Sequence, residues 1–350
     1  MERREFAKTA LYSLGSLVVP LGDWQEIAER GQRAASLGGA VGQGELDAVR
    51  RMVASFTSAD ELFGGGHARI AVVAYLSTDV ASYLRGSFPS AEHRRGMFSA
   101  AAELAYLAGW KSFDSGNHGV AQRYYLASLR LANEADDGPL AGFVLRAMAH
   151  QAVDLGRDSA CVQLASSALD WSKSKGTPGA SALFTVVKAR GFAAERHGRA
   201  ATESLKDAEK LLSTVDWDAE PQWIRRMGFG EPSLANQTAQ ALRDLGDFTE
   251  AERQFRRSIV TRDGSSHRRI HALTLANLAD VQFTRGRLAE ACRNWSLSMQ
   301  DMQGLHSGRA HRSVLNLRRR IGSLGPRRPT FAEDLDTRAA AWLNSYSSSY

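Results

Sequence analysis

The sequence predicts an all-α protein built from helical hairpins that stack into a solenoid. Two observations predict this class. No segment alternates apolar and polar residues with the two-residue period of a half-buried strand. Instead, a helical pattern led by glycine recurs five times between residues 116 and 299, and an amphipathic segment precedes each copy. The chain has 350 residues, of which 43% are hydrophobic, and this is enough for a large core along such an array.

The repeat is clearest in Gly246–Ile259 and Gly286–Met299. Each begins with Gly, has Ala five residues later, an aromatic residue four further on and Ser three after that. This spacing places small, large and small side chains on one helix face. Equivalent segments begin at Gly116, Gly156 and, most weakly, Gly198, where the small residues start closer to the glycine.

A glycine turn joins each repeat helix to the helix before it, in which a small residue such as Gly109 or Ala279 lets the two helices approach closely. The turn glycines follow one another at steps of 40, 42, 48 and 40 residues. Tetratricopeptide repeats have a period of about 34 residues. We therefore expect tetratricopeptide-like hairpins with longer helices or loops. The long step contains DWDAEPQWIRRMGFGEP, whose prolines, glycines and tryptophans predict a structured loop.

The pattern divides the chain into four parts. Residues 1–35 form an N-terminal amphipathic helical arm, 36–44 a Gly-rich linker, 45–345 the repeat domain and 346–350 a polar tail. Capping helices are expected at both ends of the array, because the end of a solenoid otherwise exposes its core. The stretch TFAEDLDTRAAAWL, which begins with Thr and acidic residues, fits the C-terminal cap.

Several stretches resemble a known family. GGGHARIAVVAYL, AGWKSFDSGNHGVAQRYY, AEPQWI and ALRDLGDFTEAERQF are similar to the tetratricopeptide-like sensor region of actinobacterial helix-turn-helix transcriptional regulators, and the similarity runs from Glu45 to the C-terminus. In that family a DNA-binding domain precedes the sensor region, and a segment like RREF marks the junction. The resemblance implies a sensor region that lacks this domain, with no specific nucleic-acid binding by this chain alone.

The opening MERREFAKTALYSLG is close to a twin-arginine export pattern. An export signal needs a continuous apolar core, whereas Thr9, Tyr12, Ser13 and Ser16 interrupt this one. The apolar residues between positions 6 and 18 fall on one helical stripe instead. We expect an amphipathic helix that docks on its own array or on a partner, in a cytoplasmic protein. A cleaved export signal is the alternative.

Charge and cysteine content narrow the class of partner. The formal net charge is +6. The seven arginines of the basic segment Arg309–Arg328 account for this excess, and no acidic residue occurs between Asp301 and Glu333. It is either a solvated helix face or a basic patch that attracts nucleic acid, an acidic protein or an anionic ligand. The two cysteines, Cys161 and Cys292, favour a reduced, intracellular setting. No apolar run is long enough to span a membrane.

No motif requires catalysis, a cofactor or a metal. The sequence lacks GxxxxGK[ST], and GGAVGQG follows no predicted strand. His267 and His271 have the spacing of two metal ligands but lack a third. Neither cysteine has a nearby His-Asp pattern. We expect a non-enzymatic protein without a cofactor.

In tetratricopeptide arrays the first helix of each hairpin lines a concave groove, and we transfer this arrangement residue by residue. The expected groove residues are Tyr106, Trp110, Arg146, His150, Lys188, Phe192, Asn236, Gln240, Asn277 and Asp280. Asn and Gln suit the backbone of an extended peptide, and Arg146 and Lys188 suit a carboxylate or phosphate. The aromatic residues equally fit a core.

We therefore expect a regulatory or adaptor protein whose groove binds a peptide, a protein segment or a small signal molecule. A ligand that favours one superhelix curvature would change what the N-terminal helix contacts. No membrane partner is expected, and homo-oligomerisation is left open. The alternatives are an exported solenoid, and an enzyme or accessory protein that uses the groove as an active site.

Overall fold

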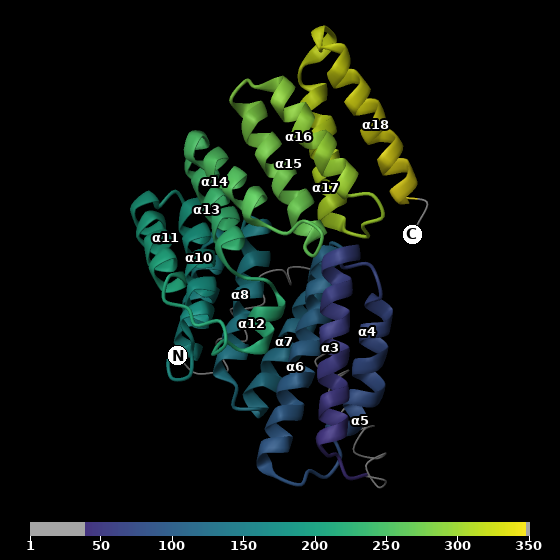
Figure 1. The fold of residues 1–350 in the computed structure, drawn as a ribbon, viewed down its shortest axis with the longest axis vertical. Helices are drawn as coiled ribbons and strands as arrows, with labels where there is room; N and C mark the ends of the chain where they lie inside the picture. The colour runs from purple at the N-terminus through teal and green to yellow at the C-terminus, as the bar shows by residue number, and fades with distance from the viewer. Residues whose placement is uncertain (1–38, 348–350) are drawn as a thin grey trace.

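The computed structural model describes residues 39–347, so the expected N-terminal arm and residues 36–38 of the expected linker lie outside the described residues, and the last two linker residues, 43 and 44, belong to the first described helix. Within residues 39–347 the chain forms helices and no strand, apart from an isolated bridge between Ala40 and Ser87. Successive helices pack as adjacent pairs (Figure 1). The predicted all-α solenoid of helical hairpins is confirmed.

The array begins with α3 (Gln43–Phe63) and a segment made of α4 (Arg69–Tyr75), the π-helical η2 (Leu76–Val80) and α5 (Ala81–Tyr83). Both α3 and α4 pack on the first helix of the next hairpin. Five hairpins follow: α6 (Ala91–Asp114) with α7 (His118–Glu134), α8 (Gly138–Asp154) with α9 (Asp158–Ser172), α10 (Pro178–Ala194) with α11 (Gly198–Leu212), α13 (Glu231–Leu245) with α14 (Phe248–Thr261), and α15 (Arg268–Thr284) with α16 (Leu288–Asp301).

Four further elements complete the array of the described residues. A last pair, α17 (Gly308–Gly322) and α18 (Thr330–Ser347), packs after α16, with a short 3-10 turn, η3 (Gly325–Arg327), between its two helices. The predicted structured loop contains one short helix, α12 (Gln222–Arg226), between α11 and α13. None of the described helices is both long and apolar enough to cross a bilayer.

The hairpin turns share one residue with a left-handed backbone. These turn residues are Gly116, Gly156, Arg196, Gly246 and Gly286, with φ between 63° and 92°. In the third hairpin the turn residue is Arg196, two positions before Gly198, so the predicted alignment on Gly198 is wrong by two residues. Counted from Arg196, the steps between turns become 40, 40, 50 and 40 residues. The insertion that carries α12 accounts for the longer step.

This register explains how each hairpin is held together. Seven residues before the turn lies a buried small residue: Gly109, Ala149, Ala189, Ala239 or Ala279. A Cβ on Gly109 would lie 2.7 Å from the Tyr125 ring, so only glycine permits this approach. Twelve residues after the turn, Ser128, Ser258 and Ser298 donate their hydroxyls to carbonyls of the first helix at 2.7–2.8 Å. The predicted face of small and large residues is therefore the interface between the two helices.

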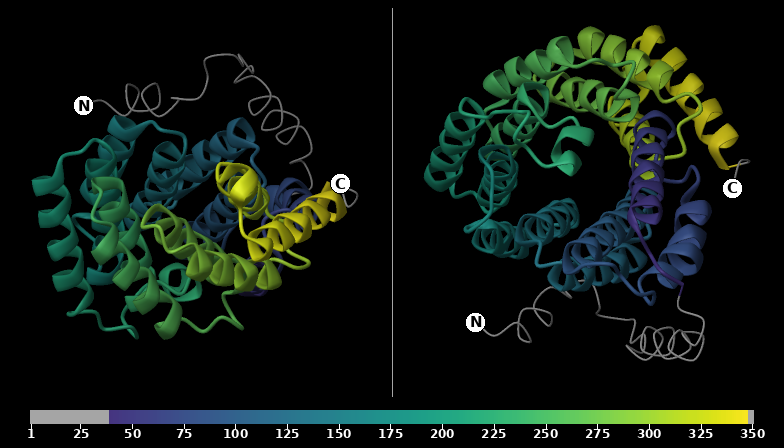
Figure 2. Two further views of the ribbon diagram at one scale, coloured as in Figure 1. Left: turned by 90° about the horizontal axis from the view of Figure 1, so that it is seen from above. Right: turned by 60° about the horizontal axis from the view of Figure 1, so that its bottom comes forward.

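The last helices return to the first and close the array into a ring (Figure 2). Arg269 of α15 lies with its Nη1 2.7 Å from Asp60 Oδ2 and 3.7 Å from Asp114 Oδ2. Lys111 Nζ lies 3.2 Å from Asp60 Oδ1, and Arg309 Nε donates to Asp114 Oδ1 at 2.9 Å. These five side chains, the closing cluster, are each exposed by 12% or less. The closing cluster therefore joins α3 and α6 to α15 and α17.

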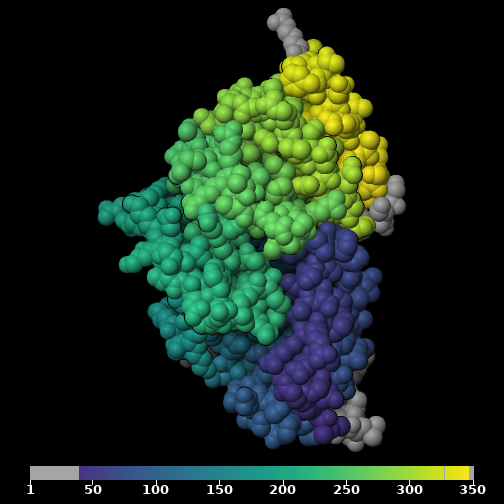
Figure 3. All heavy atoms as spheres, in the orientation of Figure 1, coloured from purple at the N-terminus to yellow at the C-terminus, as the bar shows by residue number. Residues whose placement is uncertain are grey.

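The Gly-rich turn after α3 packs directly against the closing cluster. The Gly65 N–H donates to Asp114 Oδ2 at 2.9 Å, and the Gly66 N–H donates to the His306 carbonyl at 2.8 Å. A Cβ on Gly65 would lie 2.7 Å from the Lys111 carbonyl oxygen. The glycines therefore allow α3 to meet the later helices, and Figure 3 shows the contact between α3 in purple and the later repeats in green and yellow.

Candidate functional site

A cavity of about 630 Å³, the central cavity, lies inside the ring. The first helix of each hairpin faces it, as the sequence predicts. In five hairpins the side chain six residues before the turn lines the cavity, and these five residues are Trp110, His150, Arg190, Gln240 and Asp280. One repeated position therefore places a different chemical group on the wall in each hairpin.

Seven of the ten predicted groove residues line the central cavity, and they are Trp110, Arg146, His150, Asn236, Gln240, Asn277 and Asp280. Tyr106 lines a smaller neighbouring cavity of about 70 Å³ that Trp110 also borders. It packs on Phe143 with ring centroids 4.3 Å apart, and burial raises the pKa of its hydroxyl to about 12.

The placement of Lys188 and Phe192 in the groove is incorrect. Phe192 packs in a cluster with Ala193 and Ala201, and Lys188 Nζ lies 5.6 Å from the Phe192 ring centroid. The cause is the two-residue error at Gly198, because Arg190 occupies the wall position that was assigned to Phe192. The sequence holds a signal for the correct register, since Ala201 lies five residues after Arg196, as Ala251 lies after Gly246.

Cationic side chains outnumber carboxylates on the cavity wall. Seven arginines line it, against four carboxylates, Glu61, Asp154, Asp244 and Asp280. Most of these arginines have an acidic partner, as in the pair between Arg243 Nη2 and Asp244 Oδ1 at 2.8 Å. Arg146, Arg262 and Arg312 form no ion pair with any carboxylate of residues 39–347. The wall therefore favours an anionic ligand.

Arg146 is the most enclosed of the three. It is 4% exposed, its Nη2 donates to Met227 Sδ at 3.4 Å, and its Cζ lies 4.8 Å from the Phe143 ring centroid. Thioether sulfur is only a weak acceptor. Burial lowers the pKa of the Arg146 guanidinium, which nonetheless stays charged in any physiological range. Arg146 thus faces the cavity with a thioether and the Tyr106 hydroxyl as its partners, and with no carboxylate.

His150 belongs to a separate polar network on the same wall. Burial lowers its pKa to about 3, against the opposing effect of the Asp154 carboxylate, so the ring is neutral at pH 7. The neutral ring accepts at Nδ1 from Arg190 Nη1 at 3.1 Å, and Arg190 Nη2 donates to Asp154 Oδ1 at 3.4 Å. Arg190 therefore has a carboxylate partner, which Arg146 lacks.

Another part of the wall, on α13 and α15, carries amides. Asn236 Oδ1 accepts from Thr274 Oγ1 at 3.3 Å, and Asn277 Oδ1 accepts from Arg243 Nη1 at 3.4 Å. Gln237 Oε1 is buried with no hydrogen-bond partner among the described residues. Buried acceptors are almost always satisfied in folded proteins. This wall therefore offers hydrogen-bonding capacity that the described part of the chain does not use.

The inserted segment with α12 projects into the ring (Figure 2). Its Trp223 stacks on Phe143 with ring centroids 4.5 Å apart, and Arg226 forms an ion pair with Glu103 of α6. At its start, Glu220 accepts from the Gly179 N–H at 2.7 Å. Sequence reasoning identified this segment as structured but did not place Met227 and Phe229 on the cavity wall.

Most of the basic segment Arg309–Arg328 is engaged within the array. Arg309 pairs with Asp114, Arg318 with Asp336 and Arg328 with Glu333, at 2.7–3.1 Å. Arg312 lines the central cavity. These arginines therefore contribute to packing of the last helices and to the cavity rather than to one exposed basic face.

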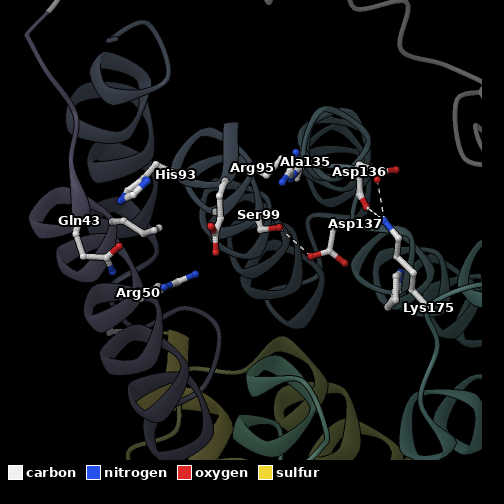
Figure 4. A pocket seen from close by; sticks show the side chains of 13 residues that line it. Gln43, Arg50, His93, Arg95, Ser99, Ala135, Asp136, Asp137 and Lys175 are labelled. Atoms are coloured by element: carbon white, nitrogen blue, oxygen red, sulfur yellow. Dashed lines mark hydrogen bonds and ion pairs between the residues drawn. The ribbon is translucent and has the colours of Figure 1, made fainter. Parts of the chain in front are cut away.

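A second cavity, of about 480 Å³, lies outside the ring between α3, α6 and the turn before α8 (Figure 4). Four of its polar side chains pair with one another: Ser99 Oγ donates to Asp137 Oδ2 at 2.8 Å, and Lys175 Nζ lies 2.7 Å from Asp136 Oδ2. Asp137 also caps α8 through the Leu140 N–H at 3.0 Å. These groups stabilise the turn, so the central cavity is the stronger candidate.

Neither cysteine thiol of the described region has the lowered pKa that makes a thiol a strong nucleophile. Burial raises the pKa of the Cys161 thiol to about 12, so it is protonated at neutral pH. Burial also raises the pKa of Cys292. Within residues 39–347 no cluster of three or more His, Cys, Asp or Glu side chains is placed to hold a metal ion.

Comparison with solved structures shows the fold. The chain is similar to Rap protein, in a crystal structure complexed with competence and sporulation factor, at 12% identity and a TM-score of 0.54, over 86% of each chain. It is also similar to BtubC (BKLC) from P. vanneervenii, at 18% identity and a TM-score of 0.46, over 67% of this chain and 91% of that chain. No protein-family model and no curated protein matches the sequence. The Rap likeness extends over most of the array and supports a helical solenoid.

Proposed function

We propose that this protein is a non-catalytic regulatory adaptor that binds a short, extended peptide in the central cavity. The observation that carries the proposal is the convergence of Trp110, His150, Arg190, Gln240 and Asp280 from five successive hairpins on one cavity. Repeated wall positions with different side chains can read successive residues of an extended ligand, as in other helical-repeat proteins. Two supporting features, the size of the cavity and its chemistry, point to the class of ligand.

The closed ring limits the size of the ligand. A volume of about 630 Å³ lies within the range of roughly 300–1,000 Å³ typical of sites for small ligands. A folded domain needs a larger open surface, whereas a few peptide residues fit. The amides of Asn236, Gln237 and Gln240 can pair with a peptide backbone, because each carries both donors and an acceptor.

Two resemblances support a regulatory role. The sequence stretches quoted above resemble sensor regions of transcriptional regulators, and the fold is similar to that of Rap protein, whose crystal structure contains competence and sporulation factor. We propose that peptide binding selects one curvature of the ring and so changes a contact with a protein partner in the cytoplasm. The neutral His150 and the protonated Cys161 thiol favour this binding role over catalysis.

The proposal is tested with a fluorescein-labelled library of pentapeptides, divided into pools by one fixed position and titrated by fluorescence anisotropy. At least one pool should give saturable binding. Gln240→Ala and Asn277→Ala, on the cavity wall, should each weaken it by about 3- to 10-fold, as expected for the loss of one hydrogen bond. Gln163→Ala, on the exposed face of α9, is the matched control. If no pool binds, or if the three variants bind equally, the proposed function is wrong.

A further inference from the structure

Two arginines and a histidine from different parts of the chain gather around the turn Met227–Gly228. Arg146 of α8 contacts Met227 Sδ. Arg262, at the end of α14, donates from Nη2 to Ser233 Oγ at 3.3 Å, and Ser233 Oγ donates in turn to the Gly228 carbonyl at 3.2 Å. The His267 ring packs against Gly228, where an added Cβ would lie only 2.3 Å from Nε2. The turn is thus a point where two arginines and a histidine meet the central cavity.

The two arginines are buried and form no ion pair, although the Glu61 carboxylate attracts Arg262 from a greater distance. Arg146 is 4% exposed and Arg262 is 9% exposed. The Nε atom of each is buried with no hydrogen-bond partner among the described residues, as it is in Arg190 and Arg269, so ion pairing alone distinguishes the four. Neither forms an ion pair with a carboxylate of residues 39–347, although Arg190 and Arg269, buried to the same degree, both do. A buried charge without a partner is costly, so a protein that keeps two of them on a cavity wall is suited to a ligand that supplies the opposite charge.

We infer that Arg146 and Arg262 form an anion subsite of the central cavity, beside the Met227–Gly228 turn, which binds a carboxylate of the ligand. A guanidinium binds a planar carboxylate with two parallel hydrogen bonds, and such charge-assisted bonds are stronger than the contact of Arg146 with a thioether. A carboxylate oxygen therefore replaces Met227 Sδ as the acceptor at Arg146 Nη2. This inference rests on the proposed function, and it assigns the peptide an acidic side chain or a C-terminal carboxylate at this point.

The first experiment tests the subsite with small anions alone. Glutarate and inorganic phosphate are each added to the full chain at constant ionic strength, set with NaCl, and thermal melting is followed by circular dichroism. Glutarate should raise Tm in a saturable manner, because a ligand that binds only the folded state stabilises it. Arg146→Met and Arg262→Met should each remove this shift. Arg253→Met is the control, since Arg253 is 71% exposed on α14, outside the cavity.

The outcomes distinguish the source of the anion. A shift with phosphate and none with glutarate overturns the carboxylate assignment. No shift with either anion, or equal shifts in wild type, Arg146→Met and Arg262→Met, overturns the subsite itself. Loss of the shift in Arg253→Met as well would mark it as a general ionic effect and would also overturn the inference. Circular dichroism spectra show whether each variant is folded. One folded variant, Arg146→Met or Arg262→Met, is enough for the test.

The second experiment separates this inference from the proposed function. A pentapeptide identified from the library is compared with its partner in which Glu is replaced by Gln or the C-terminus is amidated. Wild type should prefer the acidic form by about tenfold or more, and Arg146→Met should lose the preference. Equal binding of both forms to both proteins would overturn the subsite and leave the peptide function intact. A glutarate shift without any peptide binding would overturn the function and leave the subsite intact.

Discussion

Arg269 of α15 and Asp60 of α3 form an ion pair, with Nη1 2.7 Å from Oδ2, that joins the two ends of the helical array. Replacing Arg269 with Met leaves the buried carboxylates of Asp60 and Asp114 without this partner. We expect a loss of about 3–5 kcal/mol in the free energy of unfolding, as is typical when one member of a buried ion pair is removed. Urea denaturation followed by circular dichroism measures it.

Arg199→Met is the control for this variant, because Arg199 forms an ion pair with Glu203 on the surface with 93% of its side chain exposed. It should change stability by less than about 1 kcal/mol. If Arg269→Met unfolds at the same urea concentration as Arg199→Met, the closing cluster does not hold the ring together.

Arg146 and Arg190 are both buried on the cavity wall, but Arg190 has a carboxylate partner in Asp154, whereas Arg146 has only a thioether and the Tyr106 hydroxyl. We therefore expect opposite effects of the same substitution. Arg146→Met should raise the free energy of unfolding by about 0.5–2 kcal/mol, because it removes a buried charge that has no carboxylate partner and keeps an apolar side chain of similar length. Arg190→Met should lower it. Differential scanning calorimetry without ligand distinguishes the two, and a lower Tm for both variants would contradict the account of Arg146.

Gly65 lies between α3 and the closing cluster with no room for a side chain. Gly65→Ala would place a Cβ 2.7 Å from the Lys111 carbonyl oxygen and from Asp114 Cβ. The backbone must shift, and we expect a loss of about 1–3 kcal/mol. Gly119→Ala, on α7 with no atom within 4 Å of the new Cβ, should instead stabilise by about 0.5–1 kcal/mol. Thermal melts of the two variants should move in opposite directions from wild type.

Stability should fall below neutral pH through His150. Its pKa is lowered from 6.5 to about 3 by burial, so between these values the unfolded chain binds a proton that the folded chain does not. The free energy of unfolding therefore decreases as pH falls through this range, by at most about 1.4 kcal/mol per pH unit from this group. His150→Gln should show a shallower decrease between pH 6.5 and 4, whereas His197→Gln, at an exposed site, should follow wild type. Urea denaturation at stepped pH values measures both slopes, and parallel curves for wild type and His150→Gln would refute the assignment.

The repeat fold was predictable because local spacing determines it. The small residues before and after each turn, such as Ala239 and Ala251, are required wherever two helices pack closely, so they recur visibly. The third turn was misplaced because Arg196 adopts the left-handed conformation that glycine usually supplies, and a nearby glycine, Gly198, attracted the alignment. Lys188 and Phe192 were assigned to the groove for this reason alone.

Ring closure was not predictable from the sequence. Asp114 and Arg309 are 195 positions apart, and neither stands out among the charged residues of its helix. Their pairing depends on the summed curvature of the whole array, which no local pattern encodes. The same holds for Arg146 and Arg262, because the insertion that brings Met227 and Gly228 between them has no counterpart in the other hairpins. The amides and Arg146 were predicted as groove residues, but the subsite required the structure.

The closing cluster also fixes the circumference of the molecule. In an open solenoid each repeat touches only its neighbours, so repeats can be gained or lost at little cost. In this chain the addition of one hairpin would carry Arg269 and Arg309 a full repeat away from Asp60 and Asp114 and would leave four buried charges unmatched. Growth by duplication is thus opposed, as it is in a barrel whose strand number must satisfy closure. The length of the chain can therefore vary only in its loops, and the insertion around α12 is such a variation.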